Sequence, residues 1–280
     1  MAEQVRTTPG ISVAFSIGGS DSGGGAGIQA DLKTFAVMGV FGAAAITAVT
    51  AQNTRGVHAS HVLDPAWIEE QIDAVAGDLE VAATKVGMVG NVANVKTIAR
   101  AIERHNLYPL VVDPVMVAKG GDSLIDDAAV SALCTKLMPL AAVVTPNRRE
   151  AGRLLGRSEA VEDVFAAGEA AKAICRKFGL RACIVKGIRR PNDHEGEAVD
   201  VLFDGEALHE IVSDWRPTEN THGSGCTFSA AITAGLAKGL ELEPAVREAK
   251  NLVSEAIRQT TGLGRGISPI NHLAYLALKK

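Results

Sequence analysis

The sequence is poor in aromatic residues and nearly balanced in charge. Aromatic residues make up 4% of its 280 residues, and 28 Lys and Arg against 32 Asp and Glu give a formal net charge of −4. So few aromatic rings argue against a platform on which nucleic-acid bases stack. Without an excess of cations, no overall field favours nucleic acid or an acidic membrane surface. We therefore expect no nucleic-acid partner and no membrane partner.

Paired cysteines and an export signal are also lacking. The four cysteines show no Cys-x-x-Cys spacing, and residues 1–10 are polar, without the apolar core of a secretory signal. Residues 34–54 carry no charge, but glycines, threonines and amides interrupt this stretch, so we predict a helix end, a turn and a buried strand there rather than a membrane span. Three cysteines lie in apolar segments and are typical of buried thiols in a reduced, cytoplasmic protein: Cys134, Cys175 and Cys183.

Short apolar runs alternate with amphipathic stretches along the whole chain. A hydrophobic content of 47% is ample for a large core, and we predict a polar tail over residues 1–10 and one domain over 11–280. The predicted strands are residues 13–17, 43–49, 57–62, 82–86, 110–112, 142–144 and 183–185. The predicted helices are residues 26–38, 65–77, 92–106, 126–138, 148–155, 161–178, 226–238 and 243–260. This alternation predicts an α/β fold with a mostly parallel sheet and helices on both faces.

The last part of this pattern differs from the rest. Residues 198–203 and 206–212, joined by Asp-Gly, indicate an antiparallel hairpin near the sheet edge, and the polar residues 188–197 indicate an exposed loop. Ligands of open α/β sheets bind at the carboxyl ends of the strands. Asp113, Asn147 and Lys186 each come just after a predicted strand, so we expect them to share one crevice.

The most informative stretch is residues 220–231, in which Gly223, Ser224 and Gly225 precede an alanine-rich helix. A glycine turn at a helix start points several backbone N–H groups at one place and suits phosphate or a developing oxyanion. We call residues 223–226 the anion loop. Cys226 ends this loop, where an incoming phosphoryl group would meet it. An ordinary helix start with a buried cysteine is the alternative.

A second glycine cluster lies near the other end of the chain. Residues 18–27 hold six glycines, follow an apolar strand and precede a helical pattern. We call them the first glycine segment. Two such junctions suggest two ligands that meet in one crevice.

Several motifs together resemble one family. They are Gly-Gly-Ala-Gly-Ile-Gln-Ala-Asp-Leu-Lys-Thr (24–34), Ala-Gln-Asn-Thr (51–54), Lys-Val-Gly-Met (85–88), Thr-Pro-Asn-x-x-Glu (145–150) and Asn-Thr-His-Gly-Ser-Gly-Cys (220–226). Between about residues 11 and 272 the chain resembles the hydroxymethylpyrimidine/phosphomethylpyrimidine kinases of thiamine biosynthesis, which are ribokinase-like. The resemblance implies a three-layer α/β/α fold, ATP and Mg²⁺ as cofactors, and a homodimer. It also implies phosphorylation of 4-amino-5-hydroxymethyl-2-methylpyrimidine and then of its monophosphate.

The resemblance also assigns roles to single residues. The anion loop, with Gly223, Ser224, Gly225 and Cys226, would cradle the transferred group, and Lys186 would reach the nucleotide phosphates. Asp113 and Glu150 would hold magnesium, partly through waters. The nucleotide would contact Asn147, Lys186, Thr221 and Gly225. A surface lysine, a turn cap at Asp113 and a helix-start charge at Glu150 are the corresponding structural alternatives.

For the pyrimidine, the resemblance points to Gly19, Asp31, Gln52, Met88 and Val115. The Gln52 amide suits an adjacent ring nitrogen and amine because it offers both an acceptor and donors. Asp31 would accept from the amine or the hydroxyl, with a helix-surface charge as the alternative. Met88 and Val115 would supply apolar faces for the ring, with plain core packing as the alternative.

Cys226 stands where sugar-kinase relatives place an aspartate base. A helix N-terminus lowers a thiol pKa, so we expect a thiolate that accepts the hydroxyl proton. Because a loose transition state needs little early proton removal, we expect the anion loop to carry most of the rate and Cys226 to assist only the first step. Ser224 replaces a common threonine. After Lys186 the chain reads Gly-Ile-Arg-Arg where many relatives read Gly-Gly-His, and we expect Arg189 and Arg190 in solvent.

Three other functions remain to be compared. A dinucleotide-binding oxidoreductase fits Gly-x-Gly-x-x-Ala at residues 25–30, but no Asp or Glu lies within residues 42–53, where its ribose-binding acid is expected. No Gly-Lys pair exists, which excludes a Walker A site. A pyridoxal kinase of the same superfamily is the main alternative, although Gln52 favours the pyrimidine. A pyrimidine sensor without turnover is disfavoured by Asp113, Glu150, Lys186 and Cys226 together.

Overall fold

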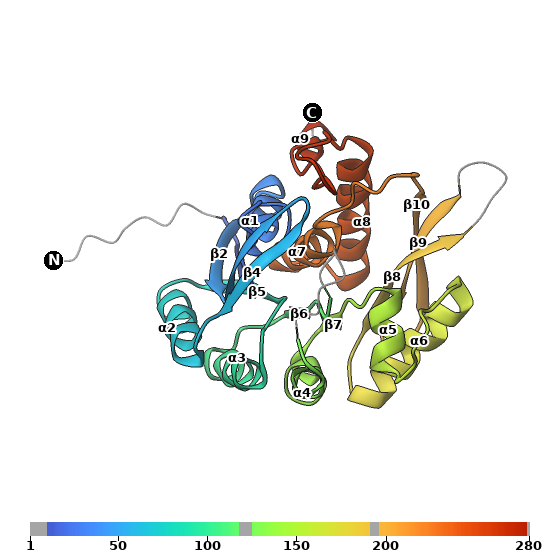
Figure 1. The fold of residues 1–280 in the computed structure, drawn as a ribbon. Coiled ribbons are helices and arrows are strands. Elements are labelled where there is room, and N and C mark those ends of the chain that lie inside the picture. Colours follow the sequence, from blue (N-terminus) through green and yellow to red (C-terminus); the bar gives the residue numbers. More distant parts are fainter. Residues whose placement is uncertain (1–9, 118–124, 191–195, 279–280) are drawn as a thin grey trace.

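A computed structural model describes residues 10–117, 125–190 and 196–278. Within them, eight strands form one sheet in the order β10-β9-β8-β7-β6-β5-β1-β2 (Figure 1). Its strands are β1 (Val13–Gly18), β2 (Phe41–Ile46), β5 (Val81–Val86), β6 (Leu110–Val112), β7 (Val143–Val144), β8 (Cys183–Arg190), β9 (Glu197–Phe203) and β10 (Leu208–Asp214). Strands β2, β1, β5, β6, β7 and β8 pair in parallel. The predicted mostly parallel sheet is therefore confirmed.

Helices cover both faces of this sheet. One face carries α2 (Pro65–Ala76), α3 (Val92–His105), α4 (Asp127–Ala132), α5 (Arg148–Leu154) and α6 (Val164–Phe178), and the other carries α1 (Gly27–Val37), α7 (Ser224–Ala237) and α8 (Leu242–Arg258), followed by the short α9 (Ala274–Leu278) (Figure 1). This is the expected three-layer arrangement. No helix among the described residues is long and apolar enough to cross a membrane.

The two helical layers enclose two cores because successive strand residues point to opposite faces. In β6, Val112 packs into the core under α3 and α6, while Val111 packs into the core under α1 and α7. Both valines are fully buried, and burying such a side chain stabilises the fold by about 1.5–3 kcal/mol. The sheet therefore holds the carboxyl ends of β6, β7 and β8 rigidly beside one another.

The predicted strand over residues 43–49 is wrong in one respect, because the chain leaves the main sheet at Thr47. There the backbone N–H donates to Gly18 O at 2.9 Å and the hydroxyl donates to Met88 O at 2.6 Å. The chain then continues as β3 (Ala48–Asn53), which pairs antiparallel with β4 (Gly56–Val62) in a separate two-stranded sheet. These hydrogen bonds end β2 and direct residues 48–53 toward the first glycine segment.

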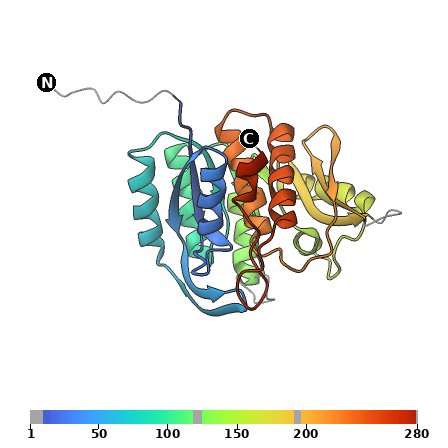
Figure 2. The same cartoon turned by 90° about the horizontal axis from the view of Figure 1, so that it is seen from above.

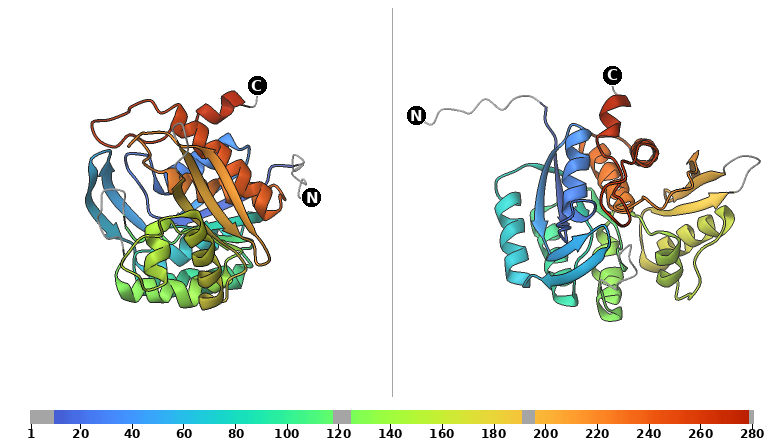
Figure 3. Two further views of the ribbon diagram at one scale, coloured as in Figure 1. Left: turned by 90° about the vertical axis from the view of Figure 1, so that its right-hand side faces the viewer. Right: turned by 45° about the horizontal axis from the view of Figure 1, so that its top comes forward.

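The antiparallel end of the sheet was predicted in part. The hairpin β9–β10 forms as expected, and it lies between α6 and α8 (Figure 3). The loop predicted over residues 188–197 is wrong at both ends, because β8 extends to Arg190 and β9 begins at Glu197. The side chain of Ile188 is fully buried and belongs to the core, which explains why the strand continues. Residues 191–195 of the predicted loop lie outside the described residues.

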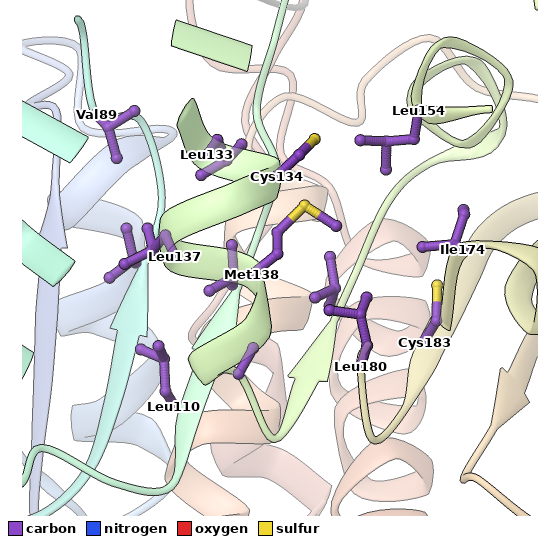
Figure 4. Close-up of a cluster of buried hydrophobic side chains, with 14 of the residues drawn as sticks. Val89, Leu110, Leu133, Cys134, Leu137, Met138, Leu154, Ile174, Leu180 and Cys183 are labelled. Atoms are coloured by element: carbon purple, nitrogen blue, oxygen red, sulfur yellow. The ribbon is translucent and has the colours of Figure 1, made fainter. Parts of the chain in front are cut away.

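The predicted helix over residues 126–138 is also irregular. Helix α4 gives way to a π-helical turn, η1 (Leu133–Leu137), and then to a 3₁₀ turn, η2 (Met138–Leu140). Figure 4 shows why this segment is held: Leu133, Cys134, Leu137 and Met138 all lie in the apolar cluster beneath the sheet. Cys134, Cys175 and Cys183 are buried free thiols, as predicted.

Candidate active site

The anion loop and the first glycine segment lie against each other. Gly223 has φ +79° and is the N-cap of α7, and a Cβ placed on it would lie 1.7 Å from the carbonyl oxygen of Gly25. Within the first segment, Gly27 has φ +57°, and its Cβ would lie 2.3 Å from the carbonyl oxygen of Gly19. Only glycine permits these approaches. The expectation that two distant junctions meet in one place is therefore confirmed.

The Ala-Gln-Asn-Thr stretch joins the same place. Ser22 Oγ donates to the carbonyl oxygen of Gln52 at 2.8 Å and accepts from its N–H at 2.8 Å. At the hairpin tip, Thr54 O accepts from the N–H of Ile267 at 2.8 Å, and Thr54 Oγ1 accepts from the N–H of Gly266 at 3.1 Å. Figure 2 shows the segment before α9 beside this tip. Segments around residues 22, 52 and 266 thus form one network.

The anion loop presents N–H groups of the kind that bind phosphate. The N–H of Ser224 donates to Thr221 O at 3.2 Å, and the N–H of Thr227 already donates within the helix to Gly223 O. No described residue accepts from the N–H groups of Gly225 and Cys226. Amides at the start of a helix of 14 residues favour an anion through both hydrogen bonding and the helix dipole.

The expected low thiol pKa of Cys226 is not what the structure supports. Part of the residue is accessible, but its thiol is enclosed, and this burial raises the pKa to about 11. The charge of Lys85 and the N–H of Gly27 act in the opposite direction, while Asp31 and Asp113 add to the effect of burial. Burial thus outweighs the expected effect of the helix start on the thiol pKa, and Cys226 is a neutral thiol at pH 7.

Lys186 and Asp113 form a buried ion pair beside the anion loop. Lys186 Nζ lies 2.7 Å from Asp113 Oδ1, which also accepts from Thr145 Oγ1 at 3.0 Å, while Ser229 Oγ donates to Oδ2 at 3.2 Å. The side chain of Lys186 is 12% exposed, so the surface-lysine alternative is wrong. Lys186 lies within β8 rather than just past its end, because this strand continues through an irregularity between Val185 and Ile188.

The Lys186 ammonium faces the anion loop directly. A Cβ on Gly225 would lie 3.4 Å from Lys186 Nζ and 4.0 Å from Asp113 Oδ2. Burial alone would lower the pKa of Lys186, but the charges of Asp113 and Glu150 raise the pKa above its ordinary value. The lysine is therefore a permanent cation next to the unpaired amides, as a phosphate site requires.

Asn147 and Glu150 form a capping box at the start of α5. The Asn147 side chain accepts from the N–H of Glu150 at 3.0 Å, and Glu150 Oε2 accepts from the N–H of Asn147 at 2.8 Å. Burial raises the pKa of Glu150 to about 7, and Asp113 adds to this shift, whereas Lys186 opposes it. The capping alternative is thus observed, and it leaves a buried carboxyl group near Lys186.

The carboxyl groups of Asp113 and Glu150 are the side chains expected to hold magnesium. The described residues contain no group of three or more His, Cys, Asp and Glu side chains that could hold a metal ion. Magnesium usually takes only one or two protein carboxylates and completes its shell with water and substrate phosphates. Asp113 and Glu150, which lie close enough for the charge of Asp113 to raise the pKa of Glu150, fit that requirement.

Asp31 has partners that the sequence did not predict. Both carboxylate oxygens accept from Lys85 Nζ, at 2.6 and 2.7 Å, and Ser16 Oγ donates to Oδ2 at 2.6 Å. The residue is 1% exposed, so a helix-surface charge is excluded. Burial alone would lower the pKa of Lys85, but the charge of Asp31 raises it. Asp31 therefore belongs to a buried ion pair beneath the site.

The other predicted pyrimidine contacts are less deeply buried. A Cβ on Gly19 would lie 2.9 Å from Met88 Sδ, so these two residues are in contact, and Met88 is partly exposed. Gln52 is half-buried, and Thr50 Oγ1 donates to its Oε1 at 3.3 Å. Val115 is also partly exposed, and its N–H donates to Asp113 O at 2.8 Å. Plain core packing does not describe Met88 or Val115.

Comparison with known proteins decides the family. The family model described as phosphomethylpyrimidine kinase matches residues 21–271. The chain belongs to the phosphomethylpyrimidine kinase family. It is 45% identical over 265 residues to a hydroxymethylpyrimidine/phosphomethylpyrimidine kinase of Bacillus subtilis, covering 95% of this chain and 96% of that protein. The resemblance found in the motifs, and the expectation of a kinase, are confirmed.

This member of the phosphomethylpyrimidine kinase family is also similar to a longer, bifunctional protein and to an enzyme named for another substrate. It is 46% identical over 260 residues to a thiamine biosynthesis bifunctional protein of Geobacter sulfurreducens, of which it spans about half (51%), while 92% of this chain is covered. The chain is also similar to Bacillus subtilis pyridoxal kinase, whose crystal structure was determined as an ADP complex. The two sequences are 39% identical, the TM-score is 0.85, and the match covers 95% of this chain and 98% of that chain. The ribokinase-like fold is thereby confirmed.

The sequence alone did not identify two residues of the site in this family member, Asp21 and His222. The Asp21 carboxylate accepts from the N–H groups of Gly23, Gly25 and Ala26, and His222 Nε2 lies 2.9 Å from its Oδ2. Burial alone would raise the pKa of Asp21, but these hydrogen bonds hold it below its ordinary value. The only hint in the sequence was that each residue lies inside a glycine-rich motif.

The remaining predicted contacts lie at the edges of the site. Thr221 is partly exposed, and its carbonyl oxygen accepts from the N–H of Ser224, at the entrance to α7. Arg189 lies over the ring of Trp215, 3.9 Å from its centroid, and Arg190 forms ion pairs with Glu197 and Glu210. The two arginines therefore have partners on the antiparallel end of the sheet, and Arg189 is exposed, as expected.

Proposed function

We propose that this kinase transfers the γ-phosphoryl group of ATP to the hydroxyl group of 4-amino-5-hydroxymethyl-2-methylpyrimidine, and then a second one to the monophosphate, in thiamine biosynthesis. One observation carries the proposal. The Lys186 ammonium lies beside Gly225 in the anion loop, where no described residue accepts from the N–H groups of Gly225 and Cys226. Phosphoryl transfer depends mostly on such positioning and on stabilisation of charge.

On the nucleotide side, the anion loop holds the transferred phosphoryl group while Lys186 neutralises charge that develops on the leaving ADP. Gly223 and Ser224 shape the loop, and Asn147 and Thr221 border the nucleotide. The ADP complex of the similar pyridoxal kinase supports ATP as the donor. Asp113 and Glu150 would hold magnesium, which would neutralise negative charge on the phosphates.

On the acceptor side, Gln52 hydrogen-bonds the aminopyrimidine edge and Met88 and Val115 cover its faces. Gly19 leaves room for the ring because any side chain there would strike Met88. Asp31 acts through the ion pair with Lys85, which keeps the floor of the site rigid, rather than through the substrate.

The two acceptors differ in the proton that they lose. The alcohol must lose its hydroxyl proton as the new P–O bond forms and the bond to ADP breaks, whereas the monophosphate is already ionised. Because burial keeps Cys226 protonated at neutral pH, its help as a base is small and confined to the first step. The anion loop supplies most of the rate in both steps.

Product analysis by mass spectrometry tests this function. With the pyrimidine alcohol, ATP and magnesium, both the monophosphate and the diphosphate should appear, and turnover should exceed that of pyridoxal measured in parallel. Neither phosphate forming would refute the proposed function. Faster turnover of pyridoxal than of the pyrimidine would instead favour the pyridoxal kinase alternative.

We further propose that residues 11–280 act as one kinase domain, that the protein is a cytoplasmic homodimer, and that it binds neither nucleic acid nor membranes. Free buried cysteines suit a reduced compartment.

Strand β2 forms an edge of the main sheet, and its Phe41 is 54% exposed, which suits contact with a second copy. Light scattering on the purified protein should give twice the mass of 29.1 kDa, and a monomer would refute the dimer.

A further inference from the structure

We propose that Asp21 and His222 form a positioning pair that sets the distance between the first glycine segment and the anion loop. The inference rests on the proposed function, because it assigns the acceptor to one segment and the transferred phosphoryl group to the other. Phosphoryl transfer requires these two partners in line and close together. The hydrogen bond between the two side chains spans 201 positions in the sequence.

Asp21 organises the first glycine segment from within. Its Oδ1 accepts from the N–H of Gly23 at 2.8 Å, and its Oδ2 accepts from the N–H groups of Gly25 at 3.0 Å and Ala26 at 2.8 Å. The residue is 2% exposed. Because a glycine-rich segment has no side chains of its own to fix its path, this carboxylate defines where the segment runs.

His222 fixes that carboxylate to the anion loop. It immediately precedes Gly223, and its Nε2 lies 2.9 Å from Asp21 Oδ2, so Nε2 must carry the proton that the carboxylate accepts. The backbone of His222 is held on both sides, because its N–H donates to Ser268 O at 3.2 Å and its carbonyl oxygen accepts from the N–H of Ile270 at 3.2 Å. The imidazole is thus anchored independently of the bond that it makes to Asp21.

Glycine at position 25 leaves space for the imidazole ring of His222. A Cβ on Gly25 would lie 2.4 Å from Cδ2 and 3.0 Å from Nε2 of His222, so the imidazole lies directly over the first glycine segment. The side-chain hydrogen bonds of the pair, among the described residues, run to Gly23, Gly25 and Ala26 and not to the anion-loop amides or the residues expected to hold the pyrimidine. Its effect is therefore on the distance between the two bound substrates and not on the affinity of either.

Three variants and one matched control test the pair. His222→Leu removes the donor, Asp21→Asn weakens the acceptor, and His222→Gln restores an N–H close to the position of Nε2. The control is His209→Leu, because His209 Nε2 makes a similar bond of 2.6 Å to Asp204 Oδ2 on the hairpin β9–β10, and β10 lies at the opposite end of the sheet order from β1, which leads into the first glycine segment. Kinetics on the pyrimidine alcohol and the stoichiometry of ADP binding are measured for each protein.

We expect His222→Leu and Asp21→Asn each to lower kcat about 30- to 100-fold, with both KM values within about threefold and one ADP bound per chain. His222→Gln should recover at least a third of the wild-type kcat, and His209→Leu should change kcat less than twofold. Combining His222→Leu with Asp21→Asn should lower kcat little further, because the two side chains act as one unit. A His222→Leu enzyme with kcat within threefold of wild type, or one that loses ADP binding in proportion to kcat, would overturn the proposal.

Hydrogen exchange separates this proposal from the proposed function. In His222→Leu, amides of residues 23–26 should exchange at least about tenfold faster than in wild type, while His209→Leu leaves them unchanged. If the wild type phosphorylates no pyrimidine, the proposed function is wrong. The exchange measurement then still shows whether Asp21 and His222 hold the first glycine segment in place. Unchanged exchange in His222→Leu would refute the pair whatever the substrate.

Discussion

Replacing Gly223 by alanine should separate the two halves of the site. Gly223 has φ +79°, and the added Cβ would lie 1.7 Å from the carbonyl oxygen of Gly25, whereas real Cβ atoms keep at least 3.0 Å from such a neighbour. The anion loop and the first glycine segment must therefore move apart by about 1.3 Å to relieve the overlap. A misplacement of about 1 Å between reacting groups can lower a rate about 100-fold.

Gly179 provides a matched control for the backbone strain. It has φ +67° at the end of α6, and a Cβ there would meet no atom within 4 Å. An alanine in the left-handed region costs about 1–2 kcal/mol at either position. Both variants should thus lose about that much free energy of unfolding in urea through backbone strain, and only Gly223→Ala should lose more through the steric overlap.

Steady-state kinetics on the pyrimidine alcohol, normalised to the amount of ADP-binding protein, distinguish the two effects. We expect kcat to fall at least about 100-fold in Gly223→Ala and less than twofold in Gly179→Ala. If Gly223→Ala kept more than a third of the wild-type kcat, the close approach of the two segments would not matter for transfer, and this reasoning would be wrong.

Three further predictions concern charge and protons. Lys186→Met should lower kcat about 100- to 1000-fold, because it removes a cation beside the transferred group. It should also destabilise the fold in urea, because Asp113 loses its ion-pair partner. An unchanged kcat would contradict this role of Lys186. Cys226→Ser should slow phosphorylation of the alcohol by up to about tenfold and that of the monophosphate less than twofold, and equal losses would refute a role limited to the first step. Glu150 has its pKa raised to about 7 in the folded state against 4.5 ordinarily, so the folded protein holds the proton more tightly. Its contribution to stability is thus present below pH 4.5 and is lost as the pH rises to 7. Glu150→Gln should remove that decline from urea titrations, and an identical pH dependence in the variant would show that Glu150 does not titrate there.

Much of the fold could be predicted because hydrophobic periodicity reports burial directly. The run Leu110-Val111-Val112 and the strand before Gly18 are buried on both faces, and continuous apolar runs are the pattern of such strands. The break at Thr47 could not be predicted in this way, since the hydrogen bonds to Gly18 and Met88 that cause it connect separate parts of the chain.

The sequence predicted those parts of the candidate site that a short motif defines. It did not predict the parts that depend on hydrogen bonds between residues far apart in the chain. Glycine patterns located the anion loop, whereas the bonds from Asp21 to His222 and from Asp31 to Lys85 depend on which distant residue faces each carboxylate. The same limit explains the error at Cys226. Local sequence showed a helix start, but burial dominates the thiol pKa, and the segments that bury the thiol lie elsewhere in the chain.

A crystal structure with the pyrimidine alcohol and a non-hydrolysable ATP analogue tests the central claim most directly. The account predicts that the γ-phosphate accepts from the N–H groups of Gly225 and Cys226, while the ring lies between Met88 and Gln52 with its hydroxyl group facing that phosphate. A pyrimidine bound away from the first glycine segment, or a γ-phosphate that makes no contact with the start of α7, would contradict it.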